Sequence, residues 1–390
     1  MPKFDFDAVI PRTGTNSVKW DIRPDVLPMW VADMDFRVAP CITEALHRKV
    51  DHGIFGYTHP LDAYYNAVSD WFGSRRGWHI DRDSIIPVSG LVPGLSICIK
   101  ALTEPGDKVV MNTPAYNCFF SSIRNTGAVL AASPLLRRGD SFELNFDEIE
   151  ALCSDPSAKV LLLCNPHNPS GRIWTREELE RLAGIALSHG MYVISDEIHC
   201  ELEMPGHRYI PFASLSGEVA QRCVSLISPT KSFNIAGIQV ANLVAANPEI
   251  RSRLDRVIND WEHCDINQFG VVALQAAYSP EGAGWLEELN AYLWDNYLVL
   301  KEMFKRDLPD YPVMRLEGTY LVWVDCGASK VSTQRIQDSL IEHEKVWING
   351  GEMYGDPRYI RINIACPRSL LTEGVSRVIA GIRRLNGNEQ

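Results

Sequence analysis

Apolar residues recur with helical spacing in several segments of the chain. Residues 42–50 place apolar side chains at every third or fourth position, and Gly53 is well placed to end this predicted helix. Residues 64–72 repeat the pattern, and we expect the second helix to end at Gly73. Both segments therefore predict amphipathic helices that pack on a core.

Short, continuously apolar runs separate the helical segments. A run without polar alternation is typical of a strand covered on both faces. We predict such strands at 85–88, 108–111, 159–164, 191–195 and 223–227. Thr175 and Glu178 form a capping-box pattern, which predicts a helix between the third and fourth strands. This alternation indicates right-handed βαβ units and an α/β fold class, with a mainly parallel central sheet sandwiched by helices.

The pattern changes after Pro280. A long helix is predicted over about 284–306, and two strand-like runs, "GTYLVWVD" (318–325) and "RYIRINIA" (358–365), flank a helix near 332–344. Fewer strands mixed with helices favour a smaller α+β domain. The predicted division is an N-terminal segment that packs with the small domain (1–40), a large domain (41–280) and a small C-terminal domain (281–390).

The composition narrows the class of protein. The 390 residues are 46% hydrophobic and 22% charged, as in an ordinary globular protein. A net charge of −11 argues against sequence-independent binding of nucleic acid. Ten cysteines without a CxxC pair indicate reduced thiols. The longest apolar stretch, 85–102, is interrupted by Pro and Gly, and no apolar run follows a basic start. We therefore expect a cytoplasmic enzyme without a signal peptide or membrane span.

Polar clusters follow the predicted strands directly. They are "SGLVPG" (89–94), "NPHNPSGR" (165–172), "DEIH" (196–199) and "SPTKSFN" (228–234). Ligands of open α/β sheets bind beyond the carboxyl ends of the strands. The sequence therefore predicts one site to which all four clusters contribute.

Lys231 is the most unusual residue among these clusters. Ser228 and Thr230 offer hydroxyl groups suited to an anion, while Phe233 and Ile235 could supply an apolar wall. An amine desolvated there has a lowered pKa and can form a Schiff base. The alternative is an ordinary exposed lysine near a strand end.

Asp196 and His199 each have two interpretations. A carboxylate at Asp196 could face a pyridine nitrogen and keep it protonated, or it could form a turn or cap a helix. His199 could donate to a ring oxygen or be a satisfied loop histidine. Glu197, His199 and Cys200 could be metal ligands, but a second spaced pair of ligands is missing, so we expect no metal site.

Three further positions could bind a ligand. The asparagines of "NPHNPSGR" are held in a rigid turn, although the segment could be only a loop. Gly90 and the amides that follow could cradle a phosphate, which is a weak signal by itself. Arg361 lies in an alternating strand pattern, where arginine is usually exposed but can also clamp a carboxylate.

Taken in order, these motifs resemble the fold-type I pyridoxal-phosphate enzymes, which have the aminotransferase-like fold. "LPMWVADMDF" (27–36), "GYTHP" (56–60) and "EGTYLVWVD" (317–325) are more narrowly similar to the MalY/PatB group. That group comprises cystathionine β-lyases and cysteine desulfhydrases of the cystalysin type. The similar segments extend from about residue 18 to 367, and the ordered set is more specific than any single motif.

The resemblance implies a role for each candidate residue. Lys231 matches the lysine that holds pyridoxal 5'-phosphate and moves the Cα proton, and Asp196 matches the partner of the pyridine nitrogen. Tyr116 matches the aromatic residue that stacks on the ring. The other matches are Asn168 and His199 for the phenolic oxygen, Gly90, Leu91, Val92 and Ser228 for the phosphate, Tyr57 for the phosphate across a homodimer interface, and Arg361, with Asn168 and Tyr57, for the substrate.

The implied activity is a carbon–sulfur β-lyase acting on a small sulfur amino acid. It would convert cystathionine or another S-substituted cysteine to a thiol, pyruvate and ammonia. Gln239 stands where many aminotransferases of this fold have a phosphate-binding arginine, which tilts the interpretation toward lyase. An aminotransferase remains the alternative, as does a lyase that also acts as a regulatory binding protein. A nicotinamide-dependent dehydrogenase is remote, because no glycine fingerprint follows an early strand.

Overall fold

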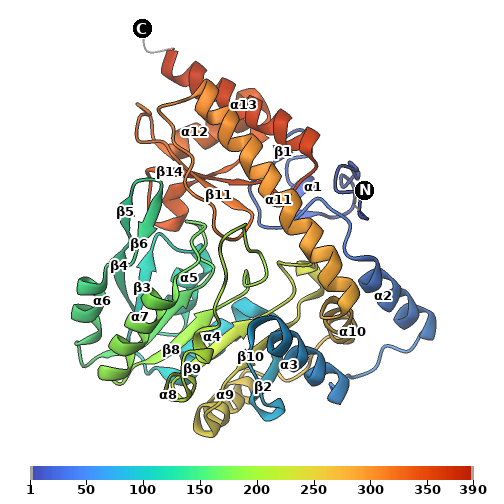
Figure 1. Cartoon of the computed structure of the whole chain (residues 1–390), viewed down its shortest axis with the longest axis vertical. Coiled ribbons are helices and arrows are strands. Elements are labelled where there is room, and N and C mark those ends of the chain that lie inside the picture. The colour runs from blue at the N-terminus through green and yellow to red at the C-terminus, as the bar shows by residue number, and fades with distance from the viewer. Residues whose placement is uncertain (1–2, 388–390) are drawn as a thin grey trace.

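A seven-stranded sheet forms the centre of the molecule in the computed structural model, which describes residues 3–387 (Figure 1). The strand order is β2-β10-β9-β8-β7-β3-β4, and only β10 runs antiparallel to its neighbours. The strands are β2 (Ile85–Val88), β3 (Lys108–Thr113), β4 (Val129–Pro134), β7 (Ala158–Cys164), β8 (Tyr192–Asp196), β9 (Cys223–Ile227) and β10 (Ala241–Val244). The predicted mainly parallel α/β sheet is confirmed.

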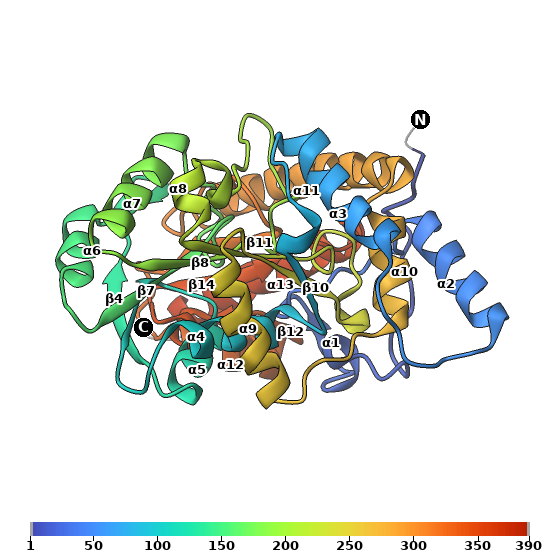
Figure 2. The same ribbon diagram turned by 90° about the horizontal axis from the view of Figure 1, so that it is seen from below.

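Helices cover both faces of this sheet (Figure 2). Along β7, Val160 and Leu162 pack into one core cluster, whereas Leu161 and Leu163 pack into the other. The apolar runs are continuous because both faces are buried. The helices of this part are α2 (Pro40–His52), α3 (Asp62–Arg76), α4 (Leu91–Leu102), α5 (Asn117–Asn125), α6 (Phe146–Cys153), α7 (Arg176–Ser188), α8 (Gly217–Ala220), α9 (Pro248–Asp260) and α10 (Gln268–Ala277).

The observed ends of three helices can be compared with the ends predicted from the sequence. Gly53 caps α2 with a φ of 74°, as predicted, and the capping box at the start of α7 is present. The predicted end of α3 at Gly73 is wrong, because that helix continues to Arg76 and Gly77 adopts the left-handed cap conformation with a φ of 67°. Gly73 is tolerated inside the helix. A Cβ atom at this position would lie close to the side chain of His79.

The C-terminal part of the chain forms a second, smaller layered unit. Its antiparallel sheet has the order β11-β14-β13 (Leu321–Asp325, Tyr359–Asn363 and Asn349–Gly350). The long helix α11 (Pro280–Asp307) packs on α13 (Arg368–Gly387), and α12 (Thr333–Ser339) lies nearby. Because α11 also contacts α10 and α2, the domain division near residue 280 stays a prediction. Residues 1–2 and 388–390 of the predicted N-terminal segment and small domain lie outside the described residues.

The N-terminal segment returns to this C-terminal unit. Strand β1 (Leu27–Pro28) pairs in parallel with β12 (Val346–Trp347). The residues after β1 then cross toward the carboxyl ends of the large sheet, where Met34 N–H donates to Asn234 Oδ1 at 2.9 Å. The segment from residue 30 to 36 therefore lies between the two units.

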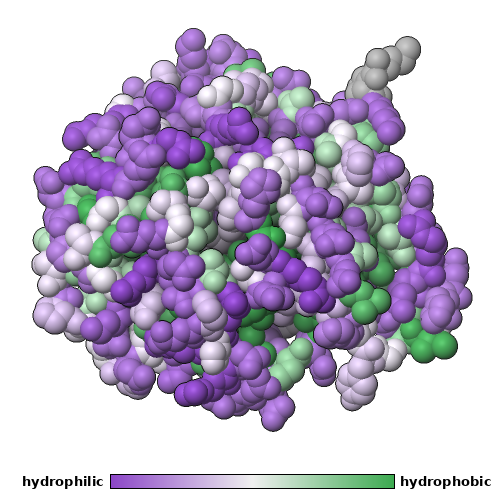
Figure 3. Space-filling model, turned by 60° about the horizontal axis from the view of Figure 1, so that its bottom comes forward, coloured by the Kyte–Doolittle hydropathy of each residue, from purple (hydrophilic) through white to green (hydrophobic). Residues whose placement is uncertain are grey.

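The connection between α2 and α3 protrudes from the body of the molecule in both ribbon views (Figures 1 and 2). It carries the exposed apolar side chains Ile54, Phe55, Tyr57 and Leu61. By contrast, the face drawn in Figure 3 is mainly hydrophilic, with apolar residues in small separate patches. Among residues 3–387, no helix combines the length and the apolar character needed to cross a bilayer.

Candidate active site

A cavity of about 170 Å³ opens at the carboxyl ends of the central strands. Most of the predicted site residues meet there, although they come from five separate segments of the chain. The predicted residues that line it are Gly90, Leu91, Val92, Tyr116, Asn168, Asp196, His199 and Lys231. Parallel strands β7, β8 and β9 end side by side, which brings their following residues together.

Lys231 points its amine into this cavity. Its Nζ donates a hydrogen bond of 2.6 Å to the carbonyl oxygen of Ala32. Burial lowers the pKa of Lys231 to about 8, and the charge of Arg361 acts in the same direction, while Asp33 and Asp196 act against it. The exposed-lysine alternative is therefore wrong. About one tenth of this amine is uncharged and nucleophilic at pH 7, far more than for an ordinary lysine.

Asp196 ends strand β8 and is 3% exposed. Its Oδ1 accepts a hydrogen bond from the backbone N–H of Ile198 at 3.1 Å. Burial raises the pKa of Asp196 to about 7, and the adjacent charge of Glu197 adds to the effect. No helix begins at Asp196, so the helix-cap interpretation is wrong. The carboxylate is held where a buried cation would stabilise its charged form.

His199 is a buried histidine whose ring is not satisfied. Within the described part of the chain, its Nδ1 has no hydrogen-bond partner. Burial lowers the pKa of His199 to about 3, with contributions from the charges of Lys231 and Arg361. The interpretation as a satisfied loop histidine is therefore wrong. The neutral ring offers one N–H donor and one acceptor to a ligand.

Arg361 lies in β14 and is 3% exposed, so it is not the usual exposed strand arginine. Its Nη1 donates to Asn168 Oδ1 at 3.1 Å, and its Nη2 donates to the carbonyl oxygen of Trp30 at 2.8 Å. The guanidinium also lies 4.6 Å from the ring centre of Tyr354. A guanidinium in this setting is oriented for a planar anion such as a carboxylate.

The start of α4 forms the opposite end of the cavity. Gly90 is the residue before this 12-residue helix, and the unpaired N–H groups of the first turn make helix starts suited to anions. Thr230 lines the cavity beside it. Ser228 is buried behind Thr230, where its hydroxyl donates to the carbonyl oxygen of Val240 at 2.6 Å and lies 2.7 Å from Thr230 Oγ1. Gln239 also lines the cavity.

Two sequence expectations do not fit the cavity of a single chain. Tyr57 is 97% exposed on the protruding connection and is not among the cavity-lining residues of 3–387. The expected apolar wall from Phe233 and Ile235 is wrong, because both side chains are buried in the core instead. Phe233 stacks on Trp285 at 5.8 Å, away from Lys231. The apolar lining comes from residues such as Phe119, Ile198 and Val240.

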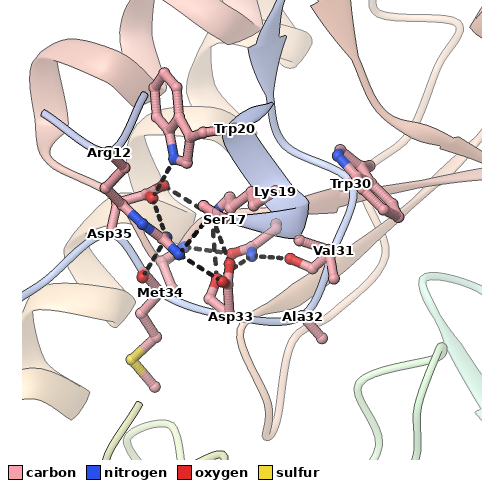
Figure 4. A network of polar contacts seen from close by, with 12 residues as sticks. Arg12, Ser17, Lys19, Trp20, Trp30, Val31, Ala32, Asp33, Met34 and Asp35 are labelled. Carbon is pink, nitrogen blue, oxygen red and sulfur yellow. Dashed lines mark hydrogen bonds and ion pairs between the residues drawn. The ribbon is translucent and has the colours of Figure 1, made fainter. Parts of the chain in front are cut away.

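The residues that face Lys231 from the N-terminal side were not predicted from the sequence. Ala32 lines the cavity, and Asp33 belongs to the charged network drawn in Figure 4. Tyr320 donates from its hydroxyl to the carbonyl oxygen of Ala32 at 3.0 Å. The motifs "LPMWVADMDF" and "EGTYLVWVD" contain these residues and were the available signal, but neither motif indicates which side chain faces Lys231.

In the described part of the chain, no three His, Cys, Asp or Glu side chains are grouped so that they could hold a metal ion. Glu197, one of the residues considered as a metal ligand, is bound within the protein instead. Glu197 Oε1 accepts from the hydroxyl of Ser195 at 2.8 Å and from the N–H of Phe212 at 2.9 Å, below the cavity.

Residues 24–378 match the aminotransferase class I and II family. The chain belongs to this family. It is 39% identical to cystathionine β-lyase PatB of Bacillus subtilis (strain 168), over 97% of this chain and 100% of PatB. It is also 34% identical to protein MalY of Escherichia coli (strain K12), over 97% of this chain and 99% of MalY. These similarities place it in the MalY/PatB group of the family.

The fold agrees with that assignment. The crystal structure of cystalysin from Treponema denticola matches with a TM-score of 0.95 and 32% identity, over 98% of this chain and 99% of cystalysin. The cystalysin crystal contains a pyridoxal 5'-phosphate cofactor. The expected aminotransferase-like fold is therefore confirmed.

Proposed function

We propose that this chain is a pyridoxal 5'-phosphate-dependent carbon–sulfur β-lyase. It cleaves cystathionine or another S-substituted cysteine, with one water molecule, to a thiol, pyruvate and ammonia. One observation carries the proposal: a partly buried lysine with a lowered pKa and a buried aspartate line one cavity, in a chain 39% identical to a cystathionine β-lyase.

The unsatisfied groups of the cavity fit the cofactor. His199 has a buried ring nitrogen without a partner among residues 3–387, and burial raises the pKa of Asp196 to about 7 despite the charge of Lys231, so a further cation beside it would stabilise its ionised form. Asp196 would hold the pyridine nitrogen, Asn168 and His199 the phenolic oxygen, Tyr116 the ring face, and Lys231 the aldehyde carbon. Bound there, the cofactor supplies an electron sink for the negative charge that develops at Cα of the substrate.

The phosphate end of the cavity has no cation from its own chain. Gln239 replaces the expected arginine, and among the lining residues of the described chain Lys231 is the one with a positive charge. Gly90, Leu91 and Val92 at the start of α4, with Ser228 nearby, bind the phosphate. A helix start suits that anion.

The substrate is bound and deprotonated by residues that already face one another. Arg361, oriented by Asn168, binds the α-carboxylate. The free amine of Lys231 takes the proton from Cα, because its lowered pKa makes the uncharged form more available near neutral pH than in an ordinary lysine. Loss of that proton allows the thiolate at Cβ to leave.

The functional unit is a homodimer in the cytoplasm. The protruding connection gathers the exposed side chains Ile54, Phe55, Tyr57 and Leu61, with Tyr57 97% exposed, and apolar side chains grouped in this way mark an interaction surface. Tyr57 reaches the phosphate, and borders the substrate, in the cavity of the partner subunit. Exchange of Tyr57 for Phe weakens cofactor retention in the dimer, which absorbance of the bound cofactor during dialysis measures.

An aminotransferase of the same family is the alternative, and product analysis separates the two. Purified holoprotein is incubated with cystathionine, and separately with S-methylcysteine, in the absence of any keto acid. A lyase releases pyruvate over many turnovers, whereas an aminotransferase forms no pyruvate and stops after one equivalent per site of the keto acid that retains the sulfur. A Lys231→Ala variant should lose turnover by at least about 1000-fold. Sustained pyruvate release by that variant would refute the assignment.

A further inference from the structure

Two sequence motifs that the proposed function leaves without a role meet at Lys231. The segment 27–36 supplies Ala32, and the segment 317–325 supplies Tyr320. The carbonyl oxygen of Ala32 accepts from Lys231 Nζ at 2.6 Å and from the Tyr320 hydroxyl at 3.0 Å. A carbonyl oxygen has two lone pairs, so both donors bind it together.

Tyr320 is held in place by an unfavourable backbone. Thr319 has a φ of 69°, which is an unfavourable outlier for a β-branched residue. A side chain at Gly318 would come within 2.9 Å of the carbonyl oxygen of Leu202. Tyr320 itself is fully buried, and its ring lies edge-on to His199 with 5.9 Å between the ring centres. The surrounding structure thus maintains a strained turn that directs this hydroxyl to Ala32.

The opposite side of the segment 30–36 is equally restrained. Asn363 Nδ2 donates to the carbonyl oxygens of Val31 at 2.6 Å and Asp33 at 2.7 Å. Asn234, three residues after Lys231, donates to the carbonyl oxygens of Met34 and Phe36. The carbonyl of Ala32 therefore belongs to a fixed piece of backbone.

Charged side chains complete this arrangement (Figure 4). Arg12 Nη2 lies 2.9 Å from Asp33 Oδ2, and Lys19 Nζ lies 3.4 Å from Asp33 Oδ1. Asp35 shares the same two cations, with Lys19 at 2.7 Å and Arg12 at 2.7 Å. Two carboxylates and two cations therefore form one compact network beside the cavity.

The charge of Asp33 acts on Lys231, and that of Asp35 is not among the main charges that do so. Asp33 directly follows Ala32, whose carbonyl accepts from Lys231, and its own carbonyl is held by Asn363. From this fixed position its negative charge favours the ammonium form of Lys231, while Arg361 opposes it. The ionisable groups that face Lys231 are Asp33, Asp196, Cys118, His199, Tyr116, Tyr320 and Arg361. Asp33 is the first of the carboxylates in the size of its effect.

We propose that Tyr320 and Asp33 are positioning residues for Lys231, Tyr320 by fixing the carbonyl that holds the amine and Asp33 by stabilising its ammonium form. The inference rests on the proposed function in one respect, namely that Lys231 accepts the Cα proton. When that proton moves from Cα to Nζ, the new ammonium group donates to Ala32 and is balanced by Asp33. A base must lie within hydrogen-bonding reach of the proton that it removes, and a lysine side chain is otherwise flexible.

The first test measures the pH at which the Lys231 amine titrates, without any catalysis. The full chain, freed of cofactor, is pulse-labelled with acetic anhydride between pH 6 and 10, and acetylation of Lys231 is quantified by peptide mass spectrometry. The wild-type midpoint is expected near pH 8. Asp33→Asn removes a stabilising charge and should move the midpoint down by roughly 0.5 to 1 unit. Asp35→Asn, the matched control in the same network, should leave it in place.

The second test uses a conservative variant that retains the core. Tyr320→Phe keeps the buried ring and removes only the hydroxyl. We expect kcat for pyruvate release to fall about 10-fold with KM unchanged, because the amine is less well placed. Labelling of Lys231 at pH 10 should become faster in the same variant. Tyr297→Phe is the matched control, since Tyr297 is also buried and donates to a backbone carbonyl, that of Met314 at 3.1 Å.

Defined outcomes overturn the inference. Equal midpoint shifts in Asp33→Asn and Asp35→Asn would mean that the network acts only through general structure. Equal losses of kcat in Tyr320→Phe and Tyr297→Phe would mean that the Tyr320 hydroxyl acts only through general structure. If neither aspartate variant folds, as judged by circular dichroism, the tyrosine pair decides alone. Failure of the lyase activity itself appears as absent pyruvate in the wild type and leaves the labelling result intact.

Discussion

Lys231 lies between two walls of different construction. The sheet wall consists of Asn168, Asp196 and His199, which follow neighbouring parallel strands. The N-terminal wall is the segment 30–36 with the side chains that bind it. Ring Nδ1 of His199 has no partner among the described residues, whereas every carbonyl from Trp30 to Met34 accepts a hydrogen bond.

The two walls therefore have different roles. Groups of the sheet wall are buried without full partners, which shifts the pKa of Asp196 up and that of His199 down. Such groups cost stability and are available to a ligand. The backbone carbonyls of the N-terminal wall are all hydrogen-bonded, and that of Ala32 holds the lysine in place. Substitutions in the first should therefore affect activity most, and substitutions in the second should also reduce stability.

The largest effect is expected for Asp196→Asn. The amide retains the size of the side chain but cannot keep a pyridine nitrogen protonated, so kcat for pyruvate release should fall about 1000-fold, equivalent to about 4 kcal/mol. Steady-state kinetics with cystathionine measure the change. A variant that retains more than a tenth of the wild-type kcat would show that the sheet wall is not the reactive one.

The same variant provides a test of stability against pH in the cofactor-free protein. The ordinary pKa of 3.8 is raised to about 7 in folded Asp196, so the unfolded chain loses its proton first as the pH rises. Wild type should lose stability relative to Asp196→Asn between about pH 4 and 7, by about 4 kcal/mol at most. Urea titrations at several pH values give the difference, and a constant difference would contradict a buried, unpaired carboxylate.

Lys19→Met, in the N-terminal wall, should reduce the stability of the protein. Lys19 is 2% exposed, and its removal leaves Asp35 and Asp33 with one cation fewer. We expect the free energy of unfolding to fall by about 3 kcal/mol, because breaking a buried ion pair leaves an uncompensated charge. Urea denaturation measures it. Arg23→Gln, which breaks an exposed pair with Asp25, is the control and should leave stability unchanged; equal losses would show that burial of the network is unimportant.

The smallest effect is expected outside both walls. Thr175→Ala removes the hydroxyl that accepts from the N–H of Glu178 at the start of α7 and should cost about 1 kcal/mol. Activity should be unchanged, because α7 does not line the cavity. Thr175→Ser, which keeps the acceptor, should restore most of the stability in thermal melts. A change in kcat in Thr175→Ala would show that a residue outside the two walls also affects catalysis.

Much of the sheet wall could be predicted from the sequence. Its strands are continuous apolar runs because both faces are buried, and a polar residue that follows such a run must lie at one edge of the sheet. For this reason Asp196, His199, Asn168 and Lys231 could be assigned to one site before any coordinates. The end of α3 was misplaced because glycine inside a helix and glycine that caps a helix have the same sequence signal.

The amino-acid sequence by itself determined the alternation of strands and helices, the family and the reactive lysine, because local spacing and short motifs encode these properties. Only the tertiary structure decided that Tyr320 and Asp33 lie beside that lysine and that Phe233 does not. Tyr320 and Lys231 are separated by almost ninety positions, and they share the carbonyl of Ala32 through long-range packing. No local pattern encodes a contact of that kind, since it depends on how two separate sheets and an N-terminal segment fit together.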